Sequence, residues 1–92
     1  MSDSFFKAIA DANRRKILFL LQKQAVLSAG EIATHFEISK AGLSDHLKIL
    51  KNADLIYSEK KGQYVFYSLN TSVFQDIMNW LTDIIDTKEV QK

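Results

Sequence analysis

The sequence predicts a mostly α-helical domain with a single two-stranded β-hairpin. Apolar residues recur at helical spacing along residues 3–24, 40–53 and 71–87. Between the last two segments lies LIYSEKKGQYVFYSL, a run rich in β-branched and aromatic residues that a Lys-Gly pair interrupts. The chain has 92 residues, no proline and 47% hydrophobic residues, which suits one modest core. We therefore expect residues 1–92 to form a single domain.

Two helices are predicted at the start of the chain, over residues 3–10 and 12–24. Asp11 is the expected N-cap of the second helix, because its short carboxylate can accept hydrogen bonds from the first unpaired amides. Ile17, Leu20 and Leu21 recur on the side that would face the core.

A short third helix is predicted to begin after Ser28 and to end near Phe36. Ser28 stands three residues before Glu31, which is the spacing of a capping box. Leu27 and Ile32 lie where a hydrophobic staple would hold the same helix end.

A tight turn follows, and a fourth helix is predicted over residues 40–53 with Ser39 as its N-cap. Ile38 is expected to be the apolar plug of the turn. A turn of this kind commonly holds a glycine with positive φ. Glu37 occupies that place here, at a cost of about 1 kcal/mol if it is left-handed.

The β-hairpin and a fifth helix complete the predicted order. Gly62 can take the positive φ of a tight hairpin turn. The last helix is predicted over residues 71–87, with Asn70 or Ser72 as its N-cap. Two helices joined by a short turn and followed by a hairpin form a winged helix-turn-helix, so the predicted fold class is mostly α with a two-stranded β wing.

The polar side of the fourth helix is the first candidate functional surface. Leu47 and Leu50 lie within about 40° of Leu43 around the helix axis, so the other residues turn away from the core. The simplest interpretation is a side that only meets water. The preceding turn, the small residues at the helix start and the following hairpin favour a helix that enters the major groove of DNA. The residues predicted to contact DNA are Ser39, Lys40, Ala41, Ser44, Asp45, His46 and Lys48.

Two of these residues have alternative roles. Asp45 would be repelled by phosphates, but it can accept a hydrogen bond from a cytosine amino group. It can equally pair with Lys48 or with a neighbouring chain. His46 lies at the edge of the buried stripe, where it is either a half-buried packing residue or a contact to phosphate or base.

The hairpin tip is the second candidate surface. Lys60 and Lys61 precede Gly62, and Gln63 follows it. Lysines at such a tip commonly protect an edge strand from pairing with other chains. Beside a helix-turn-helix they can instead reach phosphates or the adjacent minor groove, and we predict that role for them.

The predicted last helix carries more apolar surface than one small domain needs. Its apolar residues cover an arc of about 160°, against ~100° for an ordinary surface helix. The first helix has a similar excess, and the two helices either cover one another within one chain or form a two-fold interface. We predict a homodimer, with recognition helices about 34 Å apart. The predicted interface residues are Phe5, Phe6, Ile9, Phe74, Ile77, Met78, Trp80, Leu81, Ile84 and Ile85.

Charge and composition narrow the function. Residues 1–70 carry ten lysines and arginines against seven acidic residues, and residues 71–92 carry two against four. This distribution suits a body that binds an anion and a last helix turned elsewhere. Without cysteine there is no disulfide, thiolate zinc site or thiol nucleophile. No apolar run approaches the ~20 residues of a membrane span, and no catalytic motif is present, so we expect a cytoplasmic protein that is not an enzyme and has no cofactor.

Three stretches carry a resemblance to a known family. ISKAGLSDHLKIL together with KKGQYVFYSLN resembles the ArsR/SmtB family of bacterial winged-helix repressors, and within it the SdpR-like autorepressor subgroup. DANRRKIL resembles the family's Asp-x-x-Arg opening of the second helix. The resemblance covers about residues 5–86 and implies a homodimeric repressor that binds a palindromic operator near its own promoter. It implies DNA contacts from Ser39, Lys40, Ser44, Asp45 and His46, with Lys61, Gly62 and Gln63 at the wing tip.

The sequence departs from the family pattern at the start of the recognition helix. Ala41 and Gly42 stand where the family usually has Pro followed by Thr or Ser. Asp45 replaces a residue that is commonly neutral or basic. Ala12 and Asn13 replace the usual Pro and Thr in the second helix. These departures imply an unusual operator or a modest affinity.

Metal sensing is the family's best-known activity, and the sequence argues against it. The third helix lacks the cysteines of thiolate sensors, and the last helix lacks histidine. His35 and His46 lie on different helices and cannot form a ligand set alone. The acidic residues of the last segment are weak ligands for zinc-like ions and are better explained as a solvated side. These residues are Asp76, Asp83, Asp86 and Glu89.

The sequence therefore predicts a cytoplasmic, homodimeric transcriptional repressor of double-stranded DNA that does not sense metals and does not insert in membranes. The alternative is a winged-helix adapter that binds protein and not DNA. Asp45, Gly42 and the net charge of only +1 favour that alternative. A regulatory protein partner is compatible with either.

Overall fold

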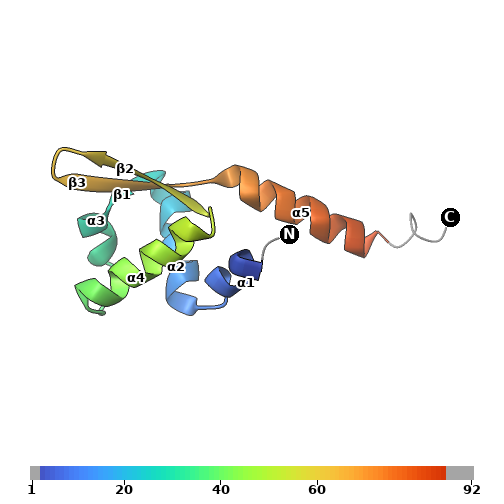
Figure 1. Ribbon diagram of the computed structural model, residues 1–92, viewed down its shortest axis with the longest axis horizontal. Helices are drawn as coiled ribbons and strands as arrows, with labels where there is room; N and C mark the ends of the chain where they lie inside the picture. Colours follow the sequence, from blue (N-terminus) through green and yellow to red (C-terminus); the bar gives the residue numbers. More distant parts are fainter. Residues whose placement is uncertain (1–2, 87–92) are drawn as a thin grey trace.

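The computed structural model describes residues 3–86 (Figure 1). Its elements are α1 (Asp3–Ile9), α2 (Ala12–Gln24), β1 (Val26–Ser28), α3 (Ala29–Ala33), α4 (Lys40–Asn52), β2 (Ile56–Lys61), β3 (Tyr64–Leu69) and α5 (Thr71–Ile85). The predicted order of helices and hairpin is confirmed. The predicted end of the last helix, Thr87, lies outside the described residues.

The elements form a compact helical body, a sheet along one side of it and a projecting last helix. In Figure 1 the sheet runs along one edge of the body formed by α1 to α4, and α5 extends away from that body. The largest fully buried side chains come from α2, α3, α4 and the segment that follows α4. They are Ile17, Leu21, Ile32, Leu50 and Leu55. One shared core therefore holds the helix-turn-helix and the base of the hairpin together.

The sheet has three strands and not the two that were predicted. Its order is β1-β3-β2, with both pairs antiparallel, and Leu27 of β1 lies opposite Tyr67 of β3. The segment Val26–Ser28 is too short for a period-two pattern to show, and its partner lies about forty residues further along the chain. The wing predicted from the sequence is the β2–β3 hairpin, and Gly62 at its tip has φ 63° as predicted.

The predicted helix starts are confirmed at the level of single hydrogen bonds. Ser28 and Glu31 form the full capping box, with each side chain accepting from the other residue's backbone amide. The Oγ of Ser39 accepts from the amide of Gly42 at 2.9 Å. Each cap satisfies amides that have no partner within the helix, so these bonds fix where α3 and α4 begin.

Three local predictions differ from the structure, the last of them only in part. Glu37 is not left-handed, because the non-glycine residues with positive φ in the described part are Ala25 and Asp54. The third helix ends at Ala33 and not near Phe36, since the next residues form only turn-type hydrogen bonds. Asn70 occupies the N-cap position of α5 but makes no side-chain capping bond, because its Nδ2 donates to the carbonyl of Asp54 at 2.9 Å.

Asp54 ends α4 in a Schellman motif. Its amide donates to the carbonyl of Lys51 at 2.9 Å, and the amide of Leu55 donates to the carbonyl of Leu50 at 3.0 Å. Asp54 itself has φ 62°, a conformation in which a side chain is strained and glycine is not. Leu50 and Leu55 are both fully buried, so the motif also turns the chain from the recognition helix into the wing.

We predict that Asp54→Gly raises the free energy of unfolding by about 0.5–1 kcal/mol, because glycine removes the left-handed strain. Asp45→Gly is the matched control, since Asp45 lies within α4, where glycine costs about 1 kcal/mol. Urea denaturation at equal chain concentration measures both. A loss of stability in Asp54→Gly would contradict the assignment of strain to this position.

Candidate nucleic-acid interface

The burial of one side of α4 decides which of its residues are available to a ligand. Leu43, Leu47 and Leu50 are 5%, 4% and 0% exposed. Leu47 and Leu50 share the side that faces α2 and β2, as the helical spacing predicts. The predicted DNA-contacting residues on the remaining surface of α4 are exposed, and these are Lys40, Ala41, Ser44, Asp45 and Lys48.

The start of α4 is tightly built around Ser39. Ser39 Oγ accepts from the amide of Gly42, so one of its two lone pairs serves the helix, and the hydroxyl proton and the second lone pair remain for another partner. A Cβ added at Gly42 would lie 3.2 Å from Ser39 Oγ, so glycine lets the cap close. The small residue at this position therefore has a structural reason in addition to the predicted close approach to a groove.

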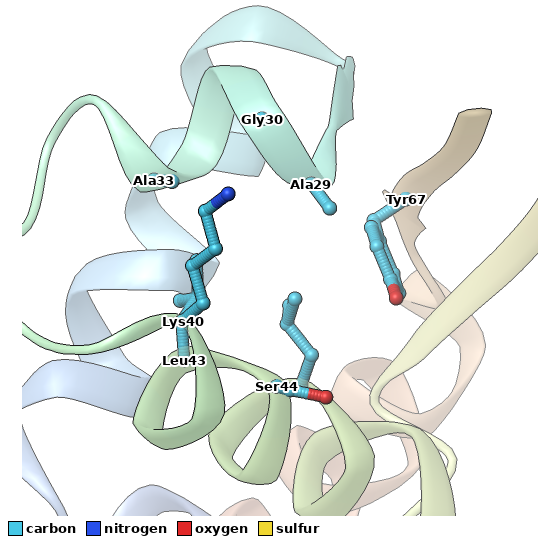
Figure 2. Close-up of a pocket in the computed structure, with 8 residues that line it drawn as sticks. Ala29, Gly30, Ala33, Lys40, Leu43, Ser44 and Tyr67 are labelled. Atoms are coloured by element: carbon cyan, nitrogen blue, oxygen red, sulfur yellow. The ribbon is translucent and has the colours of Figure 1, made fainter. Parts of the chain in front are cut away.

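A cavity of about 310 Å³ separates α3 from α4 beside the sheet (Figure 2). The small residues Ala29, Gly30 and Ala33 form its α3 side, and Lys40 and Ser44 lie on its α4 side. Tyr67 of β3 closes it, and burial raises the pKa of the Tyr67 hydroxyl above its ordinary value. Tyr67 was not predicted as a site residue. Its place beside the cavity follows from the pairing of β3 with β1, in which Tyr67 lies opposite Leu27, and that pairing was not predicted either.

The wing tip is exposed and carries one ion pair. Lys60, Lys61, Gly62 and Gln63 are all exposed, as a surface that reaches a second molecule requires. The Nζ of Lys61 lies 3.6 Å from Oε1 of Glu59. Both side chains are about two-thirds exposed or more, so the pair is weak and Lys61 can exchange Glu59 for a phosphate. Glu59 was not predicted to affect Lys61. The two residues are two positions apart on β2, so their side chains lie on the same side of the strand.

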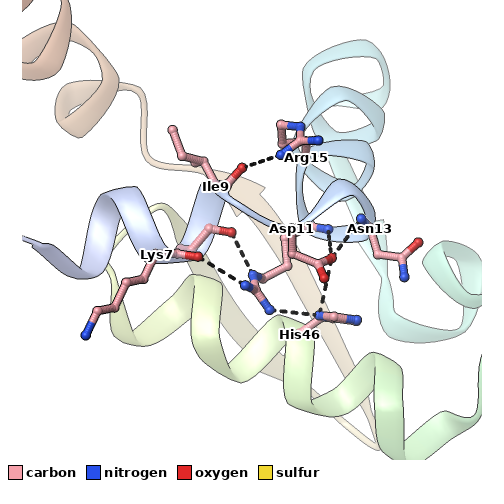
Figure 3. A network of polar contacts seen from close by, with 8 residues as sticks. Lys7, Ile9, Asp11, Asn13, Arg15 and His46 are labelled. Atoms are coloured by element: carbon pink, nitrogen blue, oxygen red, sulfur yellow. Dashed lines mark hydrogen bonds and ion pairs between the residues drawn. The ribbon is translucent and has the colours of Figure 1, made fainter.

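His46 is half-buried and faces the start of α2 (Figure 3). Its Nδ1 lies 3.2 Å from Nη1 of Arg14 and 4.0 Å from Oδ1 of Asp11. The packing role that the sequence left open is therefore present. A contact from the other edge of the ring to DNA stays a prediction.

Asp11 caps α2 and lies close to Arg14 and His46. Its Oδ1 accepts from the amides of Asn13 and Arg14 at 2.8 and 3.2 Å, which confirms the predicted N-cap. Partial burial raises the pKa of the Asp11 carboxyl, but these two hydrogen bonds and the attraction of His46 and Arg14 outweigh it, so the pKa lies below 3.8. The carboxylate is thus held ionised where the second helix meets the recognition helix.

Asp45 has no charged partner within residues 3–86. No ion pair joins it to Lys48 in the described part of the chain, and its side chain is exposed. The pairing within one chain that the sequence left open is thus not formed. Its two other proposed roles, acceptor for a base and partner of a neighbouring chain, stay predictions.

The residues predicted for a dimer interface separate into two groups. Phe5 and Ile77 are 5% and 7% exposed, so they belong to the core of this chain and are not available as a free surface. Ring contacts between α1 and α5 also form within the chain, at 5.9 Å for Phe5 with Phe74 and 5.8 Å for Phe6 with Trp80. Ile9 and Phe74 are partly buried against the core. The exposed members are Phe6, Met78, Trp80, Leu81, Ile84 and Ile85.

Residues 3–86 contain neither a cluster of metal ligands nor a membrane-spanning helix. No three His, Asp or Glu side chains gather where they could hold a metal ion, and Glu89 lies outside the described residues. No helix in this part of the chain is long and apolar enough to cross a bilayer.

Comparison with known proteins decides the family. The sequence model of a protein family, the bacterial regulatory proteins of the arsR family, matches residues 11–58. This match runs from the cap of α2 to the first strand of the wing. The chain belongs to the arsR family. The resemblance inferred from the recognition helix and the wing is thereby confirmed.

Relatives and solved structures agree with this assignment. The transcriptional repressor SdpR of Bacillus subtilis is 52% identical over 91% of this chain and 92% of its own length. The transcriptional activator HlyU of Vibrio cholerae is 38% identical over 72% of this chain and 60% of its own length. The structure of an ArsR-like transcriptional regulator from Rhodococcus sp. RHA1 has a TM-score of 0.85 at 27% identity, and the match covers 96% of this chain and 80% of that one. These relatives are transcriptional regulators and not enzymes, and this arsR-family chain is a DNA-binding regulator.

We predict that Asp11→Asn makes stability less sensitive to acid. The folded pKa of Asp11 lies below its unfolded value, so its ionised form stabilises the fold above about pH 3.8, and this contribution is lost as pH falls through the folded pKa. Asparagine keeps the N-cap but cannot titrate. Urea denaturation between about pH 6 and pH 3 measures the effect.

The control for this measurement is Asp76→Asn, a change on exposed α5 where the carboxylate accepts no hydrogen bond within the described residues. If Asp11→Asn and the unchanged chain lose stability in parallel over the whole range, the ionised cap contributes nothing specific.

Proposed function

We propose that this protein is a cytoplasmic transcriptional repressor that binds operator DNA as a homodimer near its own promoter and does not sense metals. One observation carries the proposal: α4 buries its leucines and exposes its polar residues at a capped helix start beside an exposed, lysine-bearing wing. The family supplies the regulatory context, and 52% identity to a protein named as a repressor supports repression over activation.

The start of α4 is the part proposed to enter the major groove. The exposed residues there are short or flexible, so the helix backbone can approach the base edges closely. Lys40 supplies a cation and Ser44 a hydroxyl on the side next to the cavity. Asp45 is proposed to accept from a cytosine amino group, which would make it a specificity residue and not a source of affinity.

The wing is proposed to contact the sugar-phosphate backbone or the neighbouring minor groove. Lys60 and Lys61 lie at the tip of a hairpin whose base is fixed by pairing with β1 and by the shared core. Each lysine that neutralises a phosphate releases counterions, so binding through the wing is expected to weaken as salt rises.

The homodimer is proposed from the apolar surface that one chain leaves exposed. Met78, Ile84 and Ile85 are 61%, 56% and 77% exposed on a helix that projects from the body (Figure 1). A soluble domain rarely leaves so many large apolar side chains together on one helix unless they form an interface. A second copy related by two-fold symmetry would cover them and hold two α4 helices about 34 Å apart, one turn of DNA.

A salt titration against DNA from upstream of the protein's own gene tests the proposal. Specific binding that falls linearly with salt on a logarithmic scale is expected, together with a footprint that has two-fold symmetry. Addition or chelation of zinc is expected to leave the affinity unchanged. Absence of specific binding at low salt would overturn the proposal and favour the protein-adapter alternative.

We predict that Lys61→Ala weakens binding to all DNA sequences alike, by roughly fivefold, and lowers the salt slope by about 0.9, because one phosphate contact is lost. Glu59→Gln should strengthen binding, since it removes a repelling carboxylate and leaves Lys61 unpaired. Lys51→Ala, at the far end of α4, is the matched control. Equal affinity of Lys61→Ala and the unchanged chain would show that the wing does not touch DNA.

We predict that Ile84→Glu dissociates the dimer without unfolding the chain, because Ile84 is more than half exposed in one chain. Asn79→Glu adds the same charge on the opposite side of α5 and should leave the dimer intact. Sedimentation velocity reports the mass of each variant. A monomeric unchanged chain would overturn the proposed homodimer, and a dimeric Ile84→Glu variant would place the interface elsewhere.

A further inference from the structure

We propose that Arg14 positions His46 for DNA by holding its imidazole in the tautomer whose Nε2 carries the proton. The inference rests on the proposed DNA-binding function and adds a residue from α2 to a surface otherwise built from α4 and the wing.

The guanidinium of Arg14 contacts three groups on two other helices. Its Nε donates to the carbonyl of Ala8 at 2.6 Å, and its Nη2 donates to the carbonyl of Lys7 at 3.1 Å. These carbonyls belong to the last turn of α1, and that of Lys7 also accepts from the amide of Ala10 at 3.3 Å. The third contact, from Nη1, is the 3.2 Å contact with Nδ1 of His46. Arg14 therefore ties the end of α1 to the middle of α4.

The chemistry of the third contact decides where the imidazole proton lies. A guanidinium is always protonated and only donates hydrogen bonds. Nδ1 of His46 must therefore accept, and in the neutral ring the proton then lies on Nε2. The same rule holds for histidines that bind metals: the hydrogen bond made by one ring nitrogen decides whether the other nitrogen carries a proton.

Asp11 acts in the opposite direction. Its Oδ1 lies 4.0 Å from the same Nδ1 and would favour a proton there. Arg14 prevails because its contact is shorter and because Oδ1 already accepts two backbone amides. Without Arg14, Asp11 would be the charged group left facing Nδ1 among the described residues, so the proton is expected to move to Nδ1.

The tautomer matters because the Nε2 edge is the one left for DNA. The His46 side chain is 18% exposed, and Nε2 has no hydrogen-bond partner within the described part of the chain. A protonated Nε2 can donate to a phosphate oxygen or a base acceptor, whereas a bare Nε2 would face that oxygen with a lone pair. Arg14 thus determines whether His46 attracts or repels the same atom.

Nitrogen-15 NMR of the imidazole ring at alkaline pH, where the ring is neutral, tests the tautomer without DNA. The expected result for the unchanged chain is a protonated Nε2 and a bare Nδ1, and Arg14→Met is expected to move the proton toward Nδ1. A purely structural role for Arg14 would not move this signal. A protonated Nδ1 in the unchanged chain would overturn the inference even if the variant failed to fold.

DNA binding by two variants of His46 tests the consequence. In His46→Gln the side-chain amide can reach the place of Nε2 and donate, whereas in His46→Asn the amide lies near Nδ1 and the outer donor is lost. We expect His46→Asn to lose roughly five- to tenfold in affinity, the share of one hydrogen bond, and His46→Gln to keep most of it. Arg14→Met should match His46→Asn, and the double variant should lose little more.

The outcomes separate this inference from the proposed function. If the unchanged chain binds no operator DNA, both fall. If it binds and His46→Asn binds equally well, only the role given to Arg14 and His46 falls. Circular dichroism of each variant confirms that a loss of affinity does not come from unfolding.

Discussion

The burial of the α4 leucines in the core is the constraint on which the rest of this structure depends. Leu47 and Leu50 lie on one side of α4, and both are buried. Their burial therefore fixes the rotation of α4 about its axis. That rotation leaves the polar residues outside and the helix start exposed. The same core contains Ile17 of α2 and Ile32 of α3, so the recognition helix cannot rotate without opening the packing of the two helices that hold it.

The wing is held at its base and extends beyond the body at its tip. Residues 66–68 of β3 pair with β1, whereas the tip pairs only with β2. Because Ser28 is both the last residue of β1 and the N-cap of α3, the strand that anchors the wing and the helix that supports α4 are adjacent in sequence. The Schellman turn at Asp54 and the bond from the Asn70 side chain to the Asp54 carbonyl hold the same base of the hairpin. Short connections therefore fix α4 and the wing relative to one another.

The projecting helix α5 has one part packed on its own chain and one part exposed. Its start packs on the chain's own core through Ile77 and on α1 through aromatic contacts. Its end leaves large apolar side chains on the surface, and Asp76 and Asp83 lie on this helix, which extends away from the body (Figure 1). This division places negative charge away from the surface proposed to meet phosphate. Arg14 connects α1 to α4, because its guanidinium binds the carbonyls of Lys7 and Ala8 and also contacts His46.

The features that depend on neighbours along the chain follow from the amino-acid sequence. The capping box at Ser28, the cap at Ser39, the leucine spacing of α4 and the positive φ of Gly62 each arise within a few residues, so the helices, the hairpin and the exposed candidate surface could be predicted. The features that join distant segments come from tertiary packing. They are the pairing of β1 with β3, the bond of Asn70 to the Asp54 carbonyl, and the meeting of Arg14 with His46. Local patterns carry no information on which distant groups the packed core brings within hydrogen-bonding distance, and that is why these contacts escaped prediction.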